Sequence, residues 1–483
     1  MSGAKKLNPD GATSGPFTRV LQHTPNLADL SAAFPDQYPY LLETTTRSKS
    51  CSHSLLLFAG SDVLVLDPEN GLNGPGSGDS FFERLESWYQ SEKTGFTETE
   101  HHGNPLIPFT GGWFVYLGYE VAAEIEDSLE LPYNQTGMPD AIAHRCPGAI
   151  VVFHDPGEPA LDKAVVVAES AAILAEMLSC LERMPVQRQK VKAGQLIELV
   201  EEDPDRYKAS MSQIHDYLLA GDIFQVNISR AWSGSFCAAV DPVALYHSLR
   251  KFNPAPFAGL LRWQDSVMLS SSPERLVQIR DGNIQTRPIA GTRPRGASCG
   301  QDKALSDELI AHPKERAEHI MLIDLERNDL GRVCRTGTVE VNELMVVESY
   351  AHVHHIVSNV RGELHADASP IDAIKAVFPG GTITGCPKVR CMEIIAELEG
   401  EGRGYYTGSM GYLGLDGSMD LNILIRSMLV RGNEIGFRTG GGIVVDSVAE
   451  QEIRETRHKA KGMLLAIESY SNSTHPRKER KHA

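Results

Sequence analysis

Short apolar runs that alternate with polar residues recur along most of this chain, and Gly, Pro or Asp bound most of them. Such runs are typical of β-strands, whereas helical spacing of apolar residues stands out at fewer places, such as 171–183 and 203–220. The strands do not alternate regularly with helices and no repeat of fixed period is present, so we predict an α+β fold rather than a parallel sheet, a solenoid or a propeller. The predicted strands span residues 54–60, 62–67, 148–153, 163–168, 257–262, 267–270, 275–280, 283–287, 338–347, 353–361, 409–414, 420–430, 434–438 and 442–445.

The charge balance and the cysteines limit the classes of function. The 483 residues include 63 acidic and 46 basic ones, a formal net charge of −17. Nucleic acids and anionic membranes are bound by a positive field, so we expect neither partner. No apolar stretch reaches the ~20 residues of a membrane span. The eight cysteines are scattered without a CxxC pair, and no targeting segment follows Lys5 and Lys6, so we expect a cytoplasmic protein with reduced thiols.

Two regions and two tails are expected along the chain. Residues 16–200 contain short strands and one closing helix, and residues 203–469 contain the longer helices and most motifs. Residues 1–15 and 471–483 are polar and rich in Gly, Pro or charge, so we predict that both are disordered tails.

Two predicted helices carry carboxylates three residues apart. Pro313 suits a first helical turn, and Glu315 and Glu318 then share one face; Glu452 and Glu455 repeat that spacing. Two such pairs facing each other would form an oxygen-only site, which suits Mg²⁺ bridging to an anionic ligand. Solvent-exposed helix faces show the same spacing, so residue type leaves both interpretations open.

Three glycine-rich segments are candidates for binding carboxylates through backbone N–H groups. Residues 288–296 follow a predicted strand, residues 378–395 lead into a helix starting at Pro387, and residues 438–447 join two predicted strands. None is a nucleotide-binding motif. Gly380 to Gly385 has the spacing of a P-loop, but Cys386 stands where its lysine is needed, and no GxGxxG follows a predicted strand. Ordinary turn architecture is the alternative.

Single polar side chains in predicted strands complete the candidates. Asn422 and Arg426 fall on one face of the strand at 420–430, where Arg426 could clamp a carboxylate. His354 and His355 point to opposite faces of the strand at 353–361. Buried histidines and arginines also serve as structural groups, so each alone has two interpretations.

Taken together, these segments resemble the chorismate-utilising enzymes: component I of anthranilate synthase and of aminodeoxychorismate synthase, and the isochorismate and salicylate synthases. The resemblance covers residues 203–469, and more weakly 38–131. It implies one large α+β body with two β-sheets packed as a sandwich and helices outside, acting on the dianion chorismate. The segments that carry it, in the family's order, are DIFQVNISR, SSPERL, PIAGTRPRG, KERAEHIMLIDLERNDLGR, GGTITGCPK, YYTGSMGY, DLNILIRS, GGGIVVDS and EIRETRHKA.

The resemblance also implies roles for individual residues. Glu318 and Glu455 match the direct Mg²⁺ ligands, with Glu315 and Glu452 supporting them. Glu274 matches the general acid at the C4 hydroxyl, and His355 the histidine beside the ring. The residues expected to bind or line the substrate are Gly291, Thr292, Thr382, Tyr406, Arg426, Gly440, Gly441, Gly442 and Lys459.

Two positions distinguish members of this family. Those that add water to chorismate carry a lysine base where this chain has Gln225, which fits an ammonia nucleophile better. Many aminodeoxychorismate synthases have a lysine that attacks C2 covalently where this chain has Ala290, which has no nucleophile. Anthranilate synthases carry alanine at this position, so Ala290 taken alone indicates anthranilate synthase. A subclass of aminodeoxychorismate synthases is similar in carrying alanine, and there ammonia itself adds at C2 to give noncovalent 2-amino-2-deoxyisochorismate.

Other segments favour that subclass, notably GGWFVYLGYE and FPGGTITGCPKVRCMEII. NPAPFAG at 253–259 departs from the NPSPYMF of tryptophan-sensing members, so we expect no regulation by tryptophan. We predict the product 4-amino-4-deoxychorismate, a precursor of 4-aminobenzoate and folate. The alternatives are anthranilate synthase component I and a noncatalytic chorismate-binding protein. The sequence contains no GxCxGxQ segment, so we expect ammonia from a separate glutamine amidotransferase subunit, in a heterodimer, or from solution.

Overall fold

The computed structural model describes residues 16–46, 52–94, 107–155, 157–185, 194–296, 298–349 and 353–472, and its strands form two antiparallel sheets. In spatial order the first sheet contains β1 (Phe17–Val20), β9 (Lys163–Ala168), β8 (Gly148–Phe153), β3 (His53–Phe58), β2 (Tyr40–Glu43), β12 (Phe257–Trp263), β13 (Ser266–Ser272), β22 (Ser427–Arg431), β23 (Glu434–Ile443), β11 (Gln225–Phe236) and β10 (Leu196–Glu201), with β19 (Gly385–Cys386) beside β11. The second contains β16 (Ile289–Pro294), β18 (Val353–Glu363), β15 (Asn283–Thr286), β14 (Arg275–Arg280), β21 (Met419–Asn422), β20 (Ser409–Gly414), β6 (Gly112–Leu117), β7 (Ala141–Cys146), β4 (Val63–Asp67) and β5 (Gly71–Asn73), with β17 (Glu340–Ser349) beside β18.

The two sheets pack face to face. Strand β6 shows why: it is buried on both faces, and its side chains alternate between two cores. Phe114 and Tyr116 enter the layer between the sheets, where the Phe114 ring stacks on Tyr40 of β2 with 3.8 Å between centroids. Trp113 and Val115 enter an outer core. The predicted sandwich is therefore confirmed.

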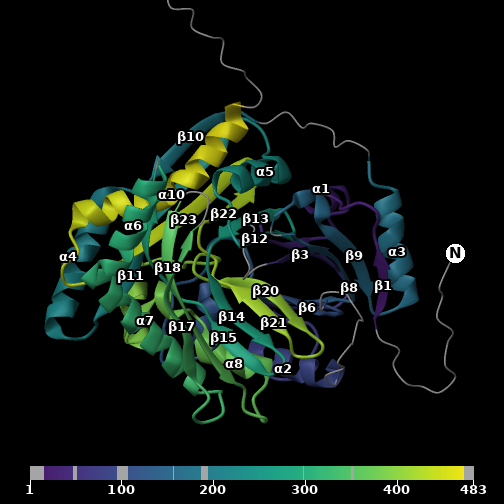
Figure 1. Cartoon of the computed structure of the whole chain (residues 1–483), viewed down its shortest axis with the longest axis horizontal. Helices are drawn as coiled ribbons and strands as arrows, with labels where there is room; N and C mark the ends of the chain where they lie inside the picture. Colours follow the sequence, from purple (N-terminus) through teal and green to yellow (C-terminus); the bar gives the residue numbers. More distant parts are fainter. Residues whose placement is uncertain are drawn as a thin grey trace, which may run out of the picture.

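Helices cover the outer faces of both sheets (Figure 1). Apolar residues of α1, α3, α5 and α10 pack on the first sheet, and those of α2 and α8 pack with strands of the second. The helices are α1 (Leu27–Ala33), α2 (Phe81–Glu92), α3 (Ala171–Glu182), α4 (Pro204–Ala220), α5 (Pro242–Phe252), α6 (Cys299–Ala311), α7 (Pro313–Gly331), α8 (Pro370–Val377), α9 (Lys388–Glu399) and α10 (Ala449–Asn472), with 3₁₀ turns η1 (Tyr119–Glu124), η2 (Pro159–Leu161) and η3 (Gly381–Ile383).

The regions 16–200 and 203–469 interleave in both sheets. Strand β2 pairs with β12 in the first sheet, and β6 pairs with β20 in the second. Each sheet is therefore completed only by strands from both regions, and the boundary near residue 200 does not separate two sheets.

The structure differs from two predictions, for the strand 420–430 and for the segment 438–447. The predicted strand 420–430 is two strands, β21 and β22, which belong to different sheets. Arg426 lies between them at φ 52°, in the left-handed region that few residues other than glycine adopt, and this ends any continuous strand. Residues 438–447 were predicted to contain a turn, but β23 runs straight through Gly440–Gly442, which pair with Asn227–Ser229 of β11.

Other boundaries agree more closely. Helix α7 begins at Pro313 as predicted, and α9 begins one residue after Pro387, which is its N-cap. Residues 288–296, predicted as a glycine-rich segment after a strand, instead contain strand β16 (Ile289–Pro294). Helix α10 continues to Asn472, beyond the predicted start of the tail at 471, and Ser471 accepts a hydrogen bond from the backbone of Leu196. The rest of both predicted tails lies outside the described residues.

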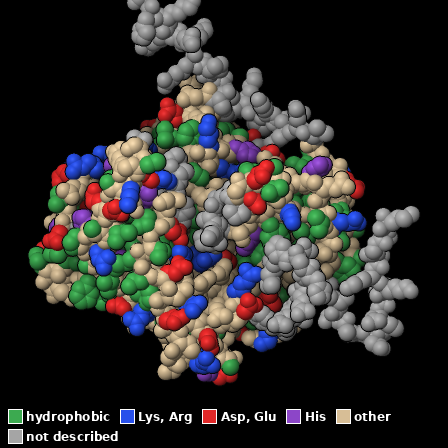
Figure 2. All heavy atoms as spheres, viewed as in Figure 1, with side chains coloured by type: hydrophobic (Ala, Val, Ile, Leu, Met, Phe, Trp, Pro, Cys, Tyr) green, Lys and Arg blue, Asp and Glu red, His purple; other side chains and the backbone are tan. Residues whose placement is uncertain are grey.

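On the face drawn in Figure 2, Lys and Arg side chains are interspersed with Asp and Glu. That face therefore presents no field of one sign to a charged polymer. Within the described ranges, no helix is both long enough and apolar enough to cross a membrane.

Candidate functional site

The first half of α7 carries the first predicted carboxylate pair. Glu315 and Glu318 lie on one side of the helix, as their spacing predicts. Oε1 of Glu318 accepts a hydrogen bond of 3.0 Å from Nε2 of Gln225 on β11, and Oε1 of Glu315 pairs with Arg293 of β16 at 3.2 Å. Burial raises the pKa of Glu318, the charges of Glu315 and Glu455 raise it further, and the hydrogen bond from Gln225 opposes this rise.

The start of α10 carries the second pair and faces the glycines of β23. A Cβ atom at Gly441 would lie 3.4 Å from Oε2 of Glu452, and 3.9 Å from both Oε1 of Glu455 and Nζ of Lys459. Nζ of Lys459 donates to the backbone O of Gly440 at 2.9 Å and pairs with Oε1 of Glu455 at 2.8 Å. The second pair therefore lies directly over this strand.

The four carboxylates fit Mg²⁺ in kind, because they offer only oxygen donors. The charges of Glu315 and Glu455 both act on Glu318, so the two helices bring their carboxylates within electrostatic reach. Among the residues that the structure describes, no three His, Cys, Asp or Glu side chains are close enough to hold an ion as they stand. Closing around an ion would require these side chains to turn toward it.

The glycines of β23 are required by close approach rather than by a turn. A Cβ atom at Gly442 would lie 2.0 Å from Nε2 of Gln225. One at Gly440 would lie 2.8 Å from both the Tyr406 hydroxyl and Oδ1 of Asn227. Only a strand without side chains lets the Gln225, Asn227 and Tyr406 side chains reach this surface.

Arg426 places its guanidinium near Tyr406 and the glycines of β23. It is half-buried at φ 52°, and its guanidinium makes no hydrogen bond or ion pair with a described residue. Burial lowers its pKa, while Tyr406 and the charge of Glu455 oppose this. Burial also raises the pKa of Tyr406 to about 12, so this hydroxyl remains a donor at neutral pH. A half-buried guanidinium beside a phenol suits a carboxylate ligand.

Glu274, between β13 and β14, has the properties of a general acid. Its side chain is buried, and the Thr382 side chain lies beside it. Burial raises the pKa of Glu274 to about 7, against the opposing effects of Thr382, the Ile289 backbone and Lys459. In a substantial fraction of the molecules, the Glu274 carboxyl group is therefore protonated at neutral pH.

Strands β16 and β18 carry the remaining predicted site residues. Nδ1 of His355 lies 3.3 Å from the backbone O of Gly291, and burial, with help from the Arg426 charge, lowers the pKa of His355 to about 4. His355 is thus neutral at pH 7. A Cβ atom at Gly291, which has φ 64°, would lie 2.8 Å from Oε2 of Glu315. Ala290 is buried beside it; Thr292 pairs with His355 through the backbone, but its side chain lies outside the described part.

These contacts bring the predicted site residues to one place, bounded by β11, β23, β16, β18, α7 and α10. The roles assigned to them stay predictions. Asn227, whose Oδ1 is buried without a hydrogen-bond partner among the described residues, lies at this place too and is not among the predicted site residues. Its position two residues from Gln225 on a strand was the available signal, since such residues share a face.

A separate cavity of about 60 Å³ lies where β2 meets β12. Its lining includes Leu42, Glu43, Phe257, Ala258 and Tyr412. The segment 253–259, singled out for tryptophan sensing, therefore meets β2 at this cavity, and no residue of α7 or α10 lines it.

This chain is similar to several known proteins. A family model described as chorismate binding enzyme matches residues 66–465. An anthranilate synthase component I-like protein of Synechocystis sp. is 44% identical over 365 residues, which cover 75% of this chain and 74% of that protein. Aminodeoxychorismate synthase component 1 of Bacillus subtilis is 41% identical over 401 residues, covering 80% and 82%. The crystal structure of anthranilate synthase component I from Streptococcus pneumoniae TIGR4 matches with a TM-score of 0.74 at 31% identity, covering 86% of this chain and 93% of that one.

Proposed function

Because the chain belongs to the family of chorismate-binding enzymes, we propose that it converts chorismate and ammonia to 4-amino-4-deoxychorismate. The proposed substrate is a dianion, and the site offers one unpaired arginine, one lysine and the carboxylates for a metal ion. A protein with a net charge of −17 can hold such an anion only by concentrating cations in the pocket.

Arg426 and Tyr406 are proposed to bind the enolpyruvyl carboxylate, with Gly440–Gly442 leaving room for it. Mg²⁺ held by Glu318 and Glu455, and supported by Glu315 and Glu452, would neutralise and hold the ring carboxylate. Lys459 and Thr382 line the same pocket, Lys459 through its contacts with Gly440 and Glu455.

In the first step, ammonia forms a bond to C2 of chorismate, the ring double bonds shift, and the C4 hydroxyl departs. Glu274 donates the proton that lets this hydroxyl leave as water, a role supported by its raised pKa. In the second step another ammonia bonds to C4 and the first leaves C2 as ammonia. The sum consumes one ammonia and releases one water, with 2-amino-2-deoxyisochorismate as a noncovalent intermediate.

The observation that carries the choice of product is the pair of segments GGWFVYLGYE and FPGGTITGCPKVRCMEII, which resemble the aminodeoxychorismate branch. The noncovalent route rests on Gln225 and Ala290, since neither position offers an amine as base or nucleophile. Intact-protein mass spectrometry during turnover should therefore detect no adduct. An adduct on a lysine near Thr292 would refute the noncovalent route.

The second candidate is anthranilate synthase component I, which would release anthranilate and pyruvate. Ala290 is compatible with it, and relatives of both names exist at similar identity. Incubation with chorismate, Mg²⁺ and ammonium at high pH, followed by mass and ultraviolet spectra, separates the two. Fluorescent 2-aminobenzoate as the main product would overturn the proposal.

The ammonia donor is proposed to be a glutamine amidotransferase subunit that forms a heterodimer with this chain. The component naming of the relatives supports a partner subunit. The expected result is that glutamine replaces ammonium only when that partner is added.

A further inference from the structure

Arg403, in the loop between α9 and β20, is enclosed by the protein, with 1% of its side chain exposed. Its guanidinium pairs in a bidentate manner with Glu399: Nε lies 2.9 Å from Oε2 and Nη2 lies 2.7 Å from Oε1. Glu399 also accepts hydrogen bonds from the backbone N–H and hydroxyl of Ser229, at 2.9 and 2.8 Å. Burial alone would raise the pKa of Glu399, but Arg403 and Arg438 outweigh it and hold this pKa at about 2. The pair is therefore charged at neutral pH.

The remaining donors of Arg403 reach two walls of the site. Nη2 donates to the backbone O of Asn227 at 2.8 Å, on the strand that carries Gln225. Nη1 donates to the backbone O of Ile383 at 3.2 Å, next to Thr382 in η3. One guanidinium thus joins strand β11 to the turn opposite Glu274.

Arg403 also supports a third wall. Its guanidinium carbon lies 5.6 Å from the ring centroid of Tyr406, within range of a cation–π contact. The backbone N–H groups of Arg403 and Gly404 donate to the carboxylate of Glu120, at 2.6 and 3.0 Å, so η1 holds the same loop in place.

We propose that Arg403, held by Glu399, is a positioning residue of the site: it fixes Asn227, the Thr382 turn and Tyr406 relative to one another without touching substrate. The inference rests on the proposed function only in taking these three walls as the chorismate site. A shift of 1 Å in such walls can lower turnover about 100-fold. Lysine is no substitute, because its single nitrogen cannot span the planar fork that reaches Glu399, Asn227 and Ile383 together.

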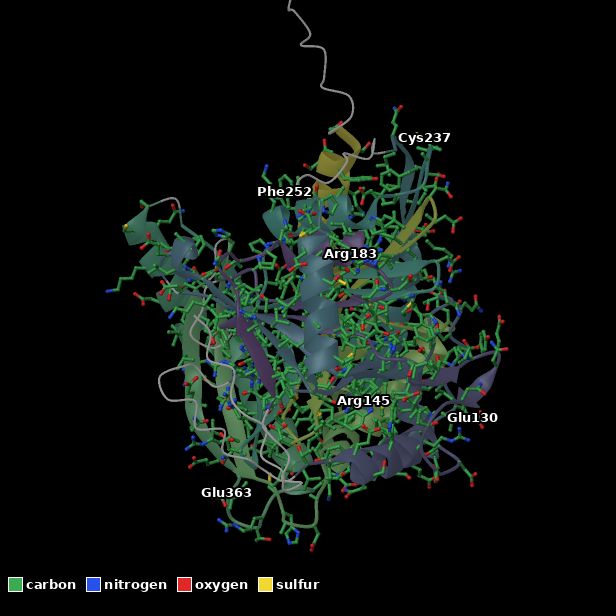
Figure 3. All side chains as sticks on the ribbon, turned by 90° about the vertical axis from the view of Figure 1, so that its right-hand side faces the viewer. Glu130, Arg145, Arg183, Cys237, Phe252 and Glu363 are labelled. Carbon is green, nitrogen blue, oxygen red and sulfur yellow. The ribbon has the colours of Figure 1, made fainter. Side chains whose placement is uncertain are left out.

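The matched control is Arg145 on β7, labelled in Figure 3. It pairs with Glu92 and Glu169, each at 2.7 Å, and donates to the backbone O of Gly112 at 3.2 Å. Its strand contributes no residue to the site. The expected result is that Arg403→Lys and Arg145→Lys both lower the thermal midpoint, but only Arg403→Lys lowers kcat/KM for chorismate, by about 100-fold, at a temperature where both are folded.

A second variant keeps the test decisive if Arg403→Lys fails to fold. Glu399→Gln with Arg403→Met removes both charges, so neither is left unpaired in the core. The same loss of kcat/KM is expected. Equal losses in the two lysine variants, or a folded double variant with wild-type kcat/KM, would overturn the positioning role.

Amide hydrogen exchange separates this inference from the proposed function. The backbone amides of segments 225–229 and 381–384 should exchange faster in Arg403→Lys than in wild type. Their exchange rates should be unchanged in Arg145→Lys. Both results are expected whether or not chorismate is the substrate. A wild-type chain that consumes no chorismate would refute the proposed function alone. Unaltered exchange in both segments would refute the positioning role alone.

Discussion

Replacing Gly442 by alanine tests how closely β23 approaches the Gln225 side chain. The new Cβ atom would lie 2.0 Å from Nε2 and 3.0 Å from Cδ of Gln225. Carbon atoms in contact are separated by about 3.5–4.0 Å, so the amide must retreat by roughly 1.5 Å. Its hydrogen bond of 3.0 Å to Glu318 cannot survive that movement.

The size of the effect follows from that hydrogen bond. A hydrogen bond to a charged group contributes about 1.5–3 kcal/mol, which corresponds to a factor of about 10 to 100 in kcat/KM if Gln225 and Glu318 act in the transition state. The lost donor also removes an interaction that lowers the pKa of Glu318, so this carboxyl should ionise less readily.

Gly436→Ala is the control, because it makes the same change on the same strand. Its Cβ atom would meet the backbone O of Trp232 at 3.8 Å, an ordinary contact. Its activity should equal wild type, and its free energy of unfolding should be unchanged or higher by about 0.4–1 kcal/mol. The assay is kcat/KM for chorismate with ammonium over a series of Mg²⁺ concentrations, together with urea unfolding. Equal kcat/KM in the two alanine variants would refute the reasoning.

Three further predictions concern the acid, the metal and the second cavity. With a pKa of about 7, Glu274 loses its proton as pH rises, so kcat/KM at fixed free ammonia should fall about tenfold per pH unit above that value; a profile flat to about pH 9 would contradict the assignment. Glu455→Gln should lose most turnover while keeping its fold by circular dichroism, whereas Glu450→Gln, an exposed neighbour on α10, should not; normal activity of Glu455→Gln at limiting Mg²⁺ would exclude it as a ligand. Tryptophan should not bind at micromolar concentration, since the segment 253–259 lacks larger side chains worth about 1–3 kcal/mol each, and calorimetry can check this.

Local periodicity accounts for what the sequence predicts well. The spacing of Glu315 and Glu318 places them on one helix face whatever surrounds the helix. The predicted strands 148–153 and 163–168 likewise have the same bounds as β8 and β9, because each is a short apolar run set off by its flanking residues.

Long-range contacts account for what it predicts poorly. The glycines at 440–442 look like a turn in isolation, and only the Gln225 and Tyr406 side chains across the ladder show why side chains are excluded there. Arg403 gives no signal either, since a charged loop residue is normally exposed. Its burial depends on Asn227, which lies 176 residues earlier in the chain.

The interleaving of the two regions has a consequence for synthesis on the ribosome. Tyr40 of β2 pairs with Leu261 of β12, which is 261 − 40 = 221 residues later. At roughly 5–20 residues per second, β2 waits on the order of 10–40 seconds for this neighbour. Strand β6 waits longer, because its partner β20 begins only at Ser409. During that interval the edges of β2 and β6 that face these partners are unpaired, and unpaired strand edges favour aggregation of a nascent chain.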